Sequence, residues 1–173
     1  MPPRPSAAEI NTFIDTHFPN VHEGTGRLEA ETAGGRSARV RMHHDVRMMR
    51  PGGTVSGPSM FKLADFSVYV AILAELGFEA QEAVTTSMTM NFLSRPRPAD
   101  MLAEVRLIKL GRRLAVAEVA LYSDGEAAMV AHATATYALP QQQAISYLIC
   151  GIILQHILSD CNTYIKSGSA GKS

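Results

Sequence analysis

The spacing of apolar residues near the N-terminus predicts a short helix. Four of them recur at helical intervals, Ile10, Phe13, Ile14 and Phe18. Ser6 and Glu9 stand at the spacing of a capping box, in which each satisfies a backbone N–H of the first turn. Pro19 follows the last apolar position and stops the pattern. We therefore expect an amphipathic helix over residues 6–18.

From Arg27 onward the period changes from helical to two, which is typical of half-buried strands. Apolar and polar residues alternate over 27–32 and again over 38–42, with Gly34-Gly35 between them, and this predicts a hairpin. Four more such segments follow, at 86–92, 101–110, 114–122 and 126–139. Their connections are short and include Asp124-Gly125, a strong hairpin signal. We expect these four strands to form an antiparallel meander, which gives about six strands in all.

A long apolar helix is expected between the two groups of strands. Residues 44–56 are irregular, and Pro58 then stands where the first residue of a helix often lies. Apolar residues cover almost every face up to Leu76, and Gly77 supplies a C-terminal stop. A helix that is apolar nearly all round has to be wrapped by other elements. The pattern thus favours an α+β domain over residues 1–140, with one central helix enclosed by an antiparallel sheet.

Residues 141–173 differ in character from the rest of the chain. Apolar residues at helical spacing predict a helix of about four turns over 145–158, and the end is rich in glycine and serine. The pattern assigns no chemistry to this tail. Two interpretations stay open: an added helix that packs on the sheet or on a partner, or a segment foreign to the natural chain.

Composition and charge narrow the class of protein further. The 173 residues are 46% hydrophobic and 18% charged, a composition typical of one globular domain with a core of its own. Sixteen basic residues balance sixteen acidic ones, so no overall positive field favours nucleic acid or an anionic membrane. Cys150 and Cys161 form no CxxC pair, and Met1-Pro-Pro-Arg-Pro lacks the apolar segment of a signal peptide. We expect a cytoplasmic protein without a metal site.

Asp65 is the candidate catalytic residue, because it lies within the apolar helix. An ionised carboxylate there has to be exposed, paired or functional, since burying it alone costs several kcal/mol. A surface pair with Lys62, three residues earlier, is the simpler interpretation. The glycine-rich segment before the helix favours a functional one. The helix would open at Gly57 with free backbone N–H groups and the positive end of its dipole, which suits a developing oxyanion. We expect Asp65, two turns later, to face the same cavity.

From about His44 to Pro140 the sequence resembles the PaaI-type acyl-CoA thioesterases of the hot-dog fold. The resembling segments are Gly57 with 63–65, then 86–93, 103–105, 110–116 and 131–139. The resemblance implies a central helix wrapped by a sheet, and a homodimer or homotetramer with its active sites between subunits. It also implies that Asp65 acts as general base or nucleophile on a thioester and that the Gly57 N–H binds the carbonyl oxygen. Ser87, four residues before Asn91, matches a serine or threonine that the partner subunit contributes to position water.

Two positions depart from the family pattern. Ser56-Gly57-Pro58 stands where the family commonly has His-Gly-Gly, and Arg50 stands where an Asn or Gln often faces the acid. Arg50 could pair with Asp65 and stabilise its carboxylate. We expect Ser56, Arg50 and Asn91 to contribute to substrate binding.

Loop arginines are candidates for holding the phosphates of coenzyme A, because guanidinium groups suit that chemistry. They are Arg95, Arg97, Arg112 and Arg113 at strand ends, and solvated loop charges are an equally good interpretation of them. The expected partners are therefore an acyl-CoA or aryl-CoA substrate and further copies of the chain, with no resident cofactor. Two other functions stay open: a hot-dog enoyl-CoA hydratase using His43 or His44, and a non-catalytic acyl-CoA binder or scaffold.

Overall fold

The computed structural model describes residues 4–140, in which a curved six-stranded sheet packs on one long helix, beside a shorter helix and a small two-stranded sheet. In chain order the helices and short 3-10 turns are α1 (Ala7–His17), η1 (Pro19–His22), η2 (Val46–Met48), α2 (Gly57–Leu76) and η3 (Phe78–Ala80). The strands are β1 (Leu28–Gly34), β2 (Ser37–Met42), β3 (Met49–Arg50), β4 (Thr54–Val55), β5 (Val84–Phe92), β6 (Met101–Leu110), β7 (Leu114–Ser123) and β8 (Met129–Ala138). The expected helices and the hairpin are confirmed. The expected tail helix lies outside the described residues.

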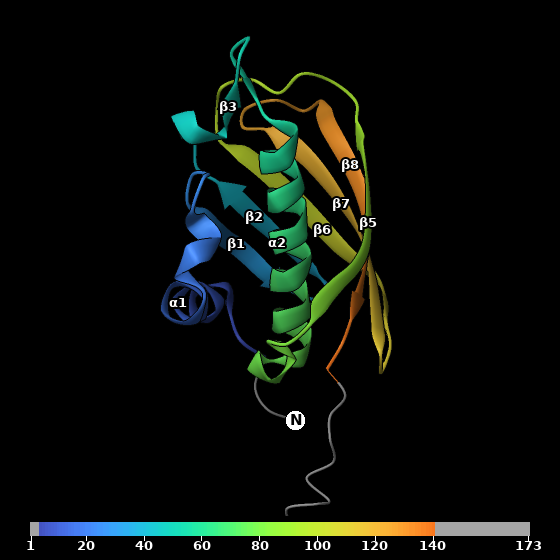
Figure 1. The fold of residues 1–173 in the computed structure, drawn as a ribbon. Helices are drawn as coiled ribbons and strands as arrows, with labels where there is room; N and C mark the ends of the chain where they lie inside the picture. Colours follow the sequence, from blue (N-terminus) through green and yellow to red (C-terminus); the bar gives the residue numbers. More distant parts are fainter. Residues whose placement is uncertain (1–3, 141–173) are drawn as a thin grey trace, which may run out of the picture. The chain divides into compact units, whose positions relative to one another are not determined.

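The six long strands form one antiparallel sheet in the order β1-β2-β6-β7-β8-β5. Only β6, β7 and β8 follow one another as a meander. The expectation of a four-stranded meander is wrong, because β5 pairs with β8 rather than with β6. Residues 93–100 cross above the sheet to connect the edge strand β5 with the central strand β6 (Figure 1). β5 is therefore an edge strand, and this decides where the candidate site lies.

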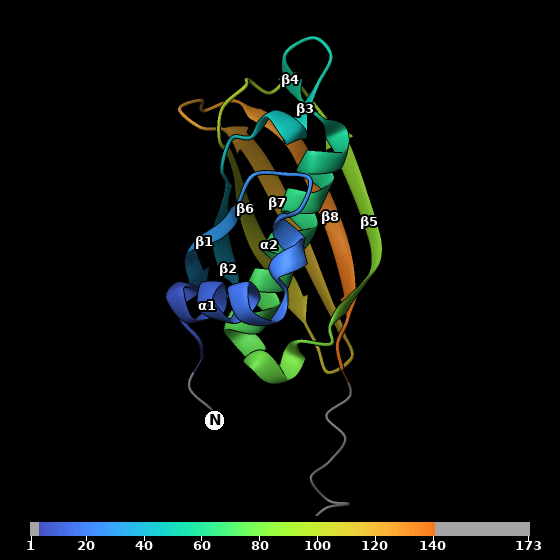
Figure 2. The ribbon, with the colours of Figure 1, turned by 60° about the vertical axis from the view of Figure 1, so that its left-hand side comes forward.

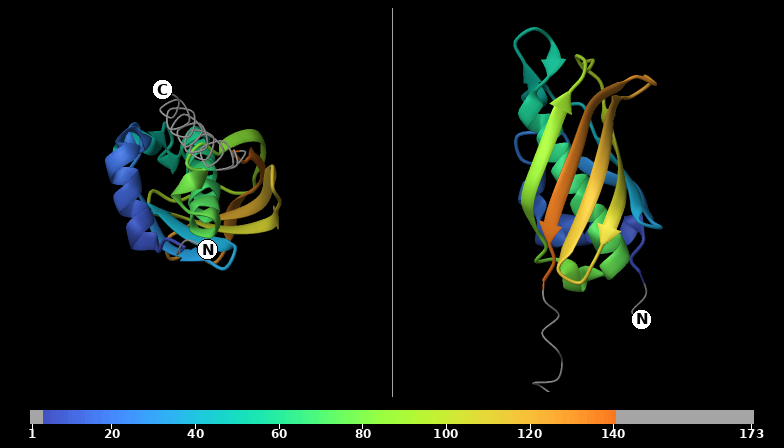
Figure 3. Two further views of the ribbon diagram at one scale, coloured as in Figure 1. Left: turned by 90° about the horizontal axis from the view of Figure 1, so that it is seen from below. Right: turned by 90° about the vertical axis from the view of Figure 1, so that its right-hand side faces the viewer.

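Helix α2 runs across the concave face of the sheet, which curves around it (Figures 1 and 3). Most of its residues are buried, including Leu63, Phe66 and Ile72. The sequence pattern explains this, since a helix with apolar residues on nearly every side needs cover all round. Ser56 caps its N-terminus, where its hydroxyl accepts from the backbone N–H of Ser59 at 3.3 Å.

Helix α1 lies beside the β1 edge of the sheet (Figure 2) and begins with the expected capping box. Asn11 joins the helix to the strand. Its amide donates to the carbonyl of Ala30 at 3.0 Å and accepts from the N–H of Ala30 at 2.9 Å, which satisfies the backbone at an irregularity in β1. Among residues 4–140, no helix has both the length and the apolar character of a membrane span.

Candidate active site

Asp65 lies on α2 and is held by hydroxyl groups from two strands of the sheet. Its Oδ1 accepts from the Thr85 hydroxyl of β5 and from the Tyr137 hydroxyl of β8, each at 2.6 Å. The Tyr137 hydroxyl also lies 2.8 Å from the main-chain oxygen of Asp65. The simpler interpretation, a surface pair with Lys62, is wrong, because the Lys62 ammonium group instead donates to the carbonyl of Glu23 at 2.6 Å.

A β-bulge in β5 brings Thr85 to this position. Thr85 lies opposite Tyr137 and Ser87 lies opposite Thr136, so Thr86 is the extra residue in the ladder. The Thr86 hydroxyl donates to the Thr136 carbonyl at 3.0 Å and ties the bulge to β8. Met88 points toward the core, and side chains alternate along a regular strand, so without the bulge Thr85 would lie on the outer face of the sheet. The bulge thus turns Thr85 toward the helix.

Tyr137 is 2% exposed and belongs to the core of the sheet. Burial and the neighbouring carboxylate of Asp65 raise the pKa of Tyr137 well above its ordinary value. The phenol therefore stays protonated at neutral pH and donates to Asp65. Sequence reasoning missed both Tyr137 and Thr85. For Tyr137 a signal exists, since a tyrosine at an inward strand position needs a partner for its hydroxyl.

Asp65 opens into a hollow of about 740 Å³ between α2, the segment after α1 and the start of β5, here called the Asp65 hollow. Its walls are largely aromatic and apolar, with polar groups between them. The lining residues are Phe13, His17, Phe18, Asn20, Val21, Lys62, Asp65, Phe66, Tyr69, Gln81, Ala83, Val84, Thr85 and Tyr137. An acyl group could rest against such walls while Asp65 faces its carbonyl carbon.

Gly57 lines a second hollow of about 410 Å³, here called the Gly57 hollow. Arg50, Phe92, Leu93 and Arg95 are among its other lining residues. Within residues 4–140, no hydrogen-bond acceptor engages the Gly57 N–H, as expected for the first residue of a helix. A Cβ atom at Gly57 would lie 3.4 Å from the Phe92 ring, so the missing side chain leaves room beside this N–H.

The two hollows are separate within one chain, which corrects the expectation that Asp65 and Gly57 face the same cavity. Eight helical residues at 1.5 Å each put the two residues about 12 Å apart along α2. Arg50 lines the Gly57 hollow and makes no ion pair with Asp65. The hollows lie at opposite ends of β5, because one includes Val84 and Thr85 and the other includes Phe92 and Leu93.

The other expected site residues are distributed over several surfaces. Met88 and Met90 pack against the core, so the exposed Ser87 and Asn91 point to the outer face of β5, away from Asp65 of the same chain. Their roles stay predictions. The Ser56 hydroxyl, 2.8 Å from the Ser59 hydroxyl, is engaged as a helix cap.

The exposed arginines fall into two groups. Within residues 4–140, Arg50, Arg95, Arg112 and Arg113 make no ion pair with any carboxylate. Arg97, by contrast, pairs with Glu126 at 2.5 Å. These four guanidinium groups are therefore free to bind an anion, as is that of the exposed Arg36 in the β1–β2 turn, and a role in holding coenzyme A stays a prediction.

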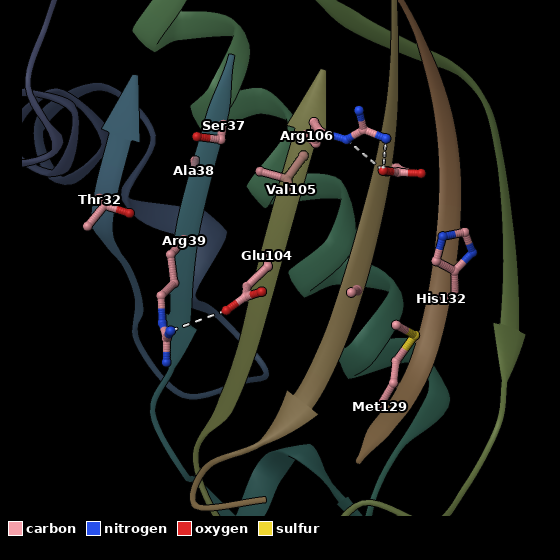
Figure 4. Close-up of a pocket in the computed structure, with 11 residues that line it drawn as sticks. Thr32, Ser37, Ala38, Arg39, Glu104, Val105, Arg106, Met129 and His132 are labelled. Carbon is pink, nitrogen blue, oxygen red and sulfur yellow. Dashed lines mark hydrogen bonds and ion pairs between the residues drawn. The ribbon is translucent and has the colours of Figure 1, made fainter. Parts of the chain in front are cut away.

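A third hollow of about 600 Å³ lies on the outer face of the sheet (Figure 4). Its charged side chains are already matched across neighbouring strands. Arg39 contacts Glu104 at 3.2 Å, and the Arg106 Nε donates to Glu118 at 2.8 Å. The sheet separates this hollow from Asp65.

Comparisons with known proteins agree with this geometry. A family model, the Thioesterase superfamily, matches residues 52–130. A crystal structure assigned as a thioesterase from Silicibacter sp. TM1040 is 39% identical and superimposes with a TM-score of 0.69, covering 80% of this chain and 96% of that one. A protein of Saccharolobus solfataricus assigned as an esterase is 26% identical over 129 residues, 75% of this chain and 76% of its own length.

The fold is also that of a variant of the phenylacetic acid degradation protein PaaI of Thermus thermophilus. That structure is 24% identical with a TM-score of 0.58, covering 68% of this chain and 96% of that one. The chain belongs to the thioesterase superfamily and has its hot-dog fold. Hydrolysis of thioesters is the general activity that this membership supports.

Proposed function

We propose that the protein hydrolyses acyl-CoA or aryl-CoA thioesters, with Asp65 as the general base or nucleophile and the Gly57 N–H as the oxyanion donor. The observation that carries the proposal is a carboxylate fixed by two hydroxyl donors at the wall of an apolar hollow. No cationic side chain among residues 4–140 forms an ion pair with this carboxylate, so it is available to a substrate or a water molecule. The unengaged Gly57 N–H at the start of α2 in a second copy of the chain would supply the complementary group.

In the general-base route, Asp65 accepts a proton from a water molecule while the water oxygen forms a bond to the thioester carbonyl carbon. The carbonyl oxygen becomes an oxyanion, which the Gly57 N–H and the helix dipole stabilise. The C–S bond then breaks, and the leaving sulfur of coenzyme A takes the proton from Asp65. In the nucleophilic route, a carboxylate oxygen attacks first and displaces the thiolate, and water hydrolyses the resulting anhydride. Both routes give the free acid and coenzyme A.

We further propose that the active site is completed by a second copy of the chain through the β5 edge. β5 is nine residues long, and its outer edge is unpaired within residues 4–140. Val84, Phe92 and Leu93 expose 58%, 55% and 57% of their surface along it. A long apolar edge strand is a ready site for pairing with another chain.

A two-fold axis through the middle of β5 would unite the two halves of the site. Residues 84–92 are centred on Met88, so antiparallel pairing about this point sets Val84 of one copy opposite Phe92 of the other. The Asp65 hollow of one subunit would then meet the Gly57 hollow of its partner. Arg50 and Arg95 at one end of the sheet would likewise approach Arg112 and Arg113 at the other, which suits the phosphates of coenzyme A.

A non-catalytic acyl-CoA binder is the second candidate function. The observation that favours it is the engagement of Ser56, which stands where the family commonly has a histidine, as a helix cap. The hydratase alternative is less well supported, because His43 contacts Glu29 at 2.7 Å and neither His43 nor His44 lines the Asp65 or the Gly57 hollow. Incubation with an acyl-CoA ester separates the first two functions: an enzyme releases free thiol, whereas a binder retains the ester intact.

A further inference from the structure

The Tyr137 hydroxyl contacts two oxygens of the same residue. It lies 2.6 Å from Asp65 Oδ1 and 2.8 Å from the Asp65 main-chain oxygen. Because a side-chain oxygen and a main-chain oxygen flank one hydroxyl group, rotation of the carboxylate about the Cα–Cβ bond would break one of the two contacts. Tyr137 itself is 2% exposed and packed in the sheet, so its hydroxyl holds a fixed position from which it can orient the Asp65 side chain.

The two oxygens of the Asp65 carboxylate have different surroundings. Oδ1 accepts hydrogen bonds from both Tyr137 and Thr85. Within residues 4–140, no group donates to Oδ2. The hydroxyl pair thus occupies one oxygen and leaves the other open for chemistry.

A phenol can donate to a carboxylate only while the phenol keeps its proton. Tyr137 can give such a bond over a wide pH range, since burial and Asp65 raise its own pKa. The same contact therefore holds the orientation of Asp65 throughout that range.

We propose that Tyr137 is a positioning residue that fixes the Asp65 carboxylate and directs its Oδ2 toward the thioester, with Thr85 as the second donor. This role rests on the proposed thioesterase function and adds to it a group that does not itself touch the substrate. A tyrosine that only filled the core would contribute through its ring, and its hydroxyl would have no effect on the reaction.

The first test replaces Tyr137 by Phe, which keeps the ring and removes the hydroxyl. Loss of a hydrogen bond to a charged group predicts a fall in kcat of roughly 10- to 100-fold with little change in KM. Tyr122→Phe on β7, away from both hollows, is the matched control and keeps the wild-type kcat and KM. Unchanged kcat in a folded Tyr137→Phe variant, or a rise in KM in place of the fall in kcat, would overturn the proposal.

The second test asks whether Tyr137 acts through Asp65. In an Asp65→Asn background, Tyr137→Phe should cause no further loss of activity, because the group that it positions is already gone. Equal losses in both backgrounds would overturn the proposal. If Tyr137→Phe fails to fold, Thr85→Val and Thr85→Ser replace it, and only the valine variant, which lacks the hydroxyl, should lower kcat.

A crystal structure separates this proposal from the proposed function. The Tyr137 hydroxyl should lie within hydrogen-bond distance of Asp65 Oδ1, with Oδ2 free of protein donors. This result would support the Tyr137–Asp65 contact even if no thioester were hydrolysed, and that outcome would refute the function alone. A Tyr137 hydroxyl turned away from Asp65 would refute the contact.

Discussion

Subunit complementation tests the shared active site, because the two halves of each site would come from different chains. Asp65→Asn removes the acid or base. Gly57→Pro removes an N–H that has no acceptor within residues 4–140 and adds a ring beside Phe92, at a helix position where proline is tolerated. Gly57→Ala is the matched control, since it adds a Cβ beside Phe92 and keeps the N–H. We expect each inactivating variant alone to lose about 10²- to 10³-fold or more.

A mixed dimer of the two variants contains one intact site and one site with both defects. We therefore expect about half of the wild-type activity per dimer, as the isologous symmetry dictates. The two chains are co-expressed with different affinity tags, mixed dimers are purified through both tags, and thiol release is followed with an acyl-CoA ester. Light scattering confirms the dimer mass. Mixed dimers as inactive as their parents would refute the shared site and place each site within one chain.

Three further predictions concern stability, substrate binding and pH. The side chain of Glu75 is almost fully buried and accepts a hydrogen bond from a backbone N–H of the β1–β2 hairpin at 2.7 Å. Glu75→Ala should therefore lower the free energy of unfolding by about 1–3 kcal/mol in urea titrations. An unchanged midpoint would contradict a stabilising role of this hydrogen bond. Arg95→Ala should raise KM for acyl-CoA esters but not for acyl-pantetheine esters, which lack the nucleotide phosphates, while Arg97→Ala leaves both KM values unchanged because its ion pair already occupies it. Hydrogen bonds from Arg47 lower the pKa of Asp45 to about 2, so the stabilising effect of the Asp45 carboxylate is complete above about pH 4 and is lost as the pH falls through 2. In thermal unfolding, Asp45→Asn should reduce the difference in stability between pH 5 and pH 2. An identical difference in wild type and variant would contradict this prediction.

The central helix and its wrapping sheet could be predicted because their signals are local and redundant. The stretch that ends at Leu76 is apolar on every face, and only an enclosing sheet can bury such a helix. Hairpin signals at Gly34-Gly35 and Asp124-Gly125 set two of the strand connections. Strand order beyond nearest neighbours was not accessible in this way. A loop of eight residues after Phe92 permits either an adjacent strand or a crossing, and the choice depends on the whole sheet.

The candidate site could be predicted only in part, for a related reason. Asp65 stands out as an acid in an apolar helix, and Gly57 stands out at the start of that helix. The position of Thr85 beside Asp65 could not be predicted, because a single β-bulge changes the face of the sheet to which its side chain points and no local sequence pattern predicts this bulge. The eight helical residues between Gly57 and Asp65 already separate them along the helix, and the sequence shows this spacing. The position of β5 at the sheet edge, which decides what walls each hollow, was not accessible in this way. The Asp65 hollow and the Gly57 hollow lie at opposite ends of the edge strand β5. This arrangement is the reason for proposing a site that is shared by two subunits.

Thiol release from a panel of acyl-CoA and aryl-CoA esters, with wild type beside Asp65→Asn, tests the central claim most directly. The asparagine keeps an oxygen that can accept from Tyr137 and Thr85, so the fold and the hollow should persist while the charge is lost. We expect turnover of at least one class of ester by the wild type and a fall of about 10²- to 10⁴-fold in the variant. Equal turnover by both proteins, or binding of every ester without release of thiol, would contradict the account.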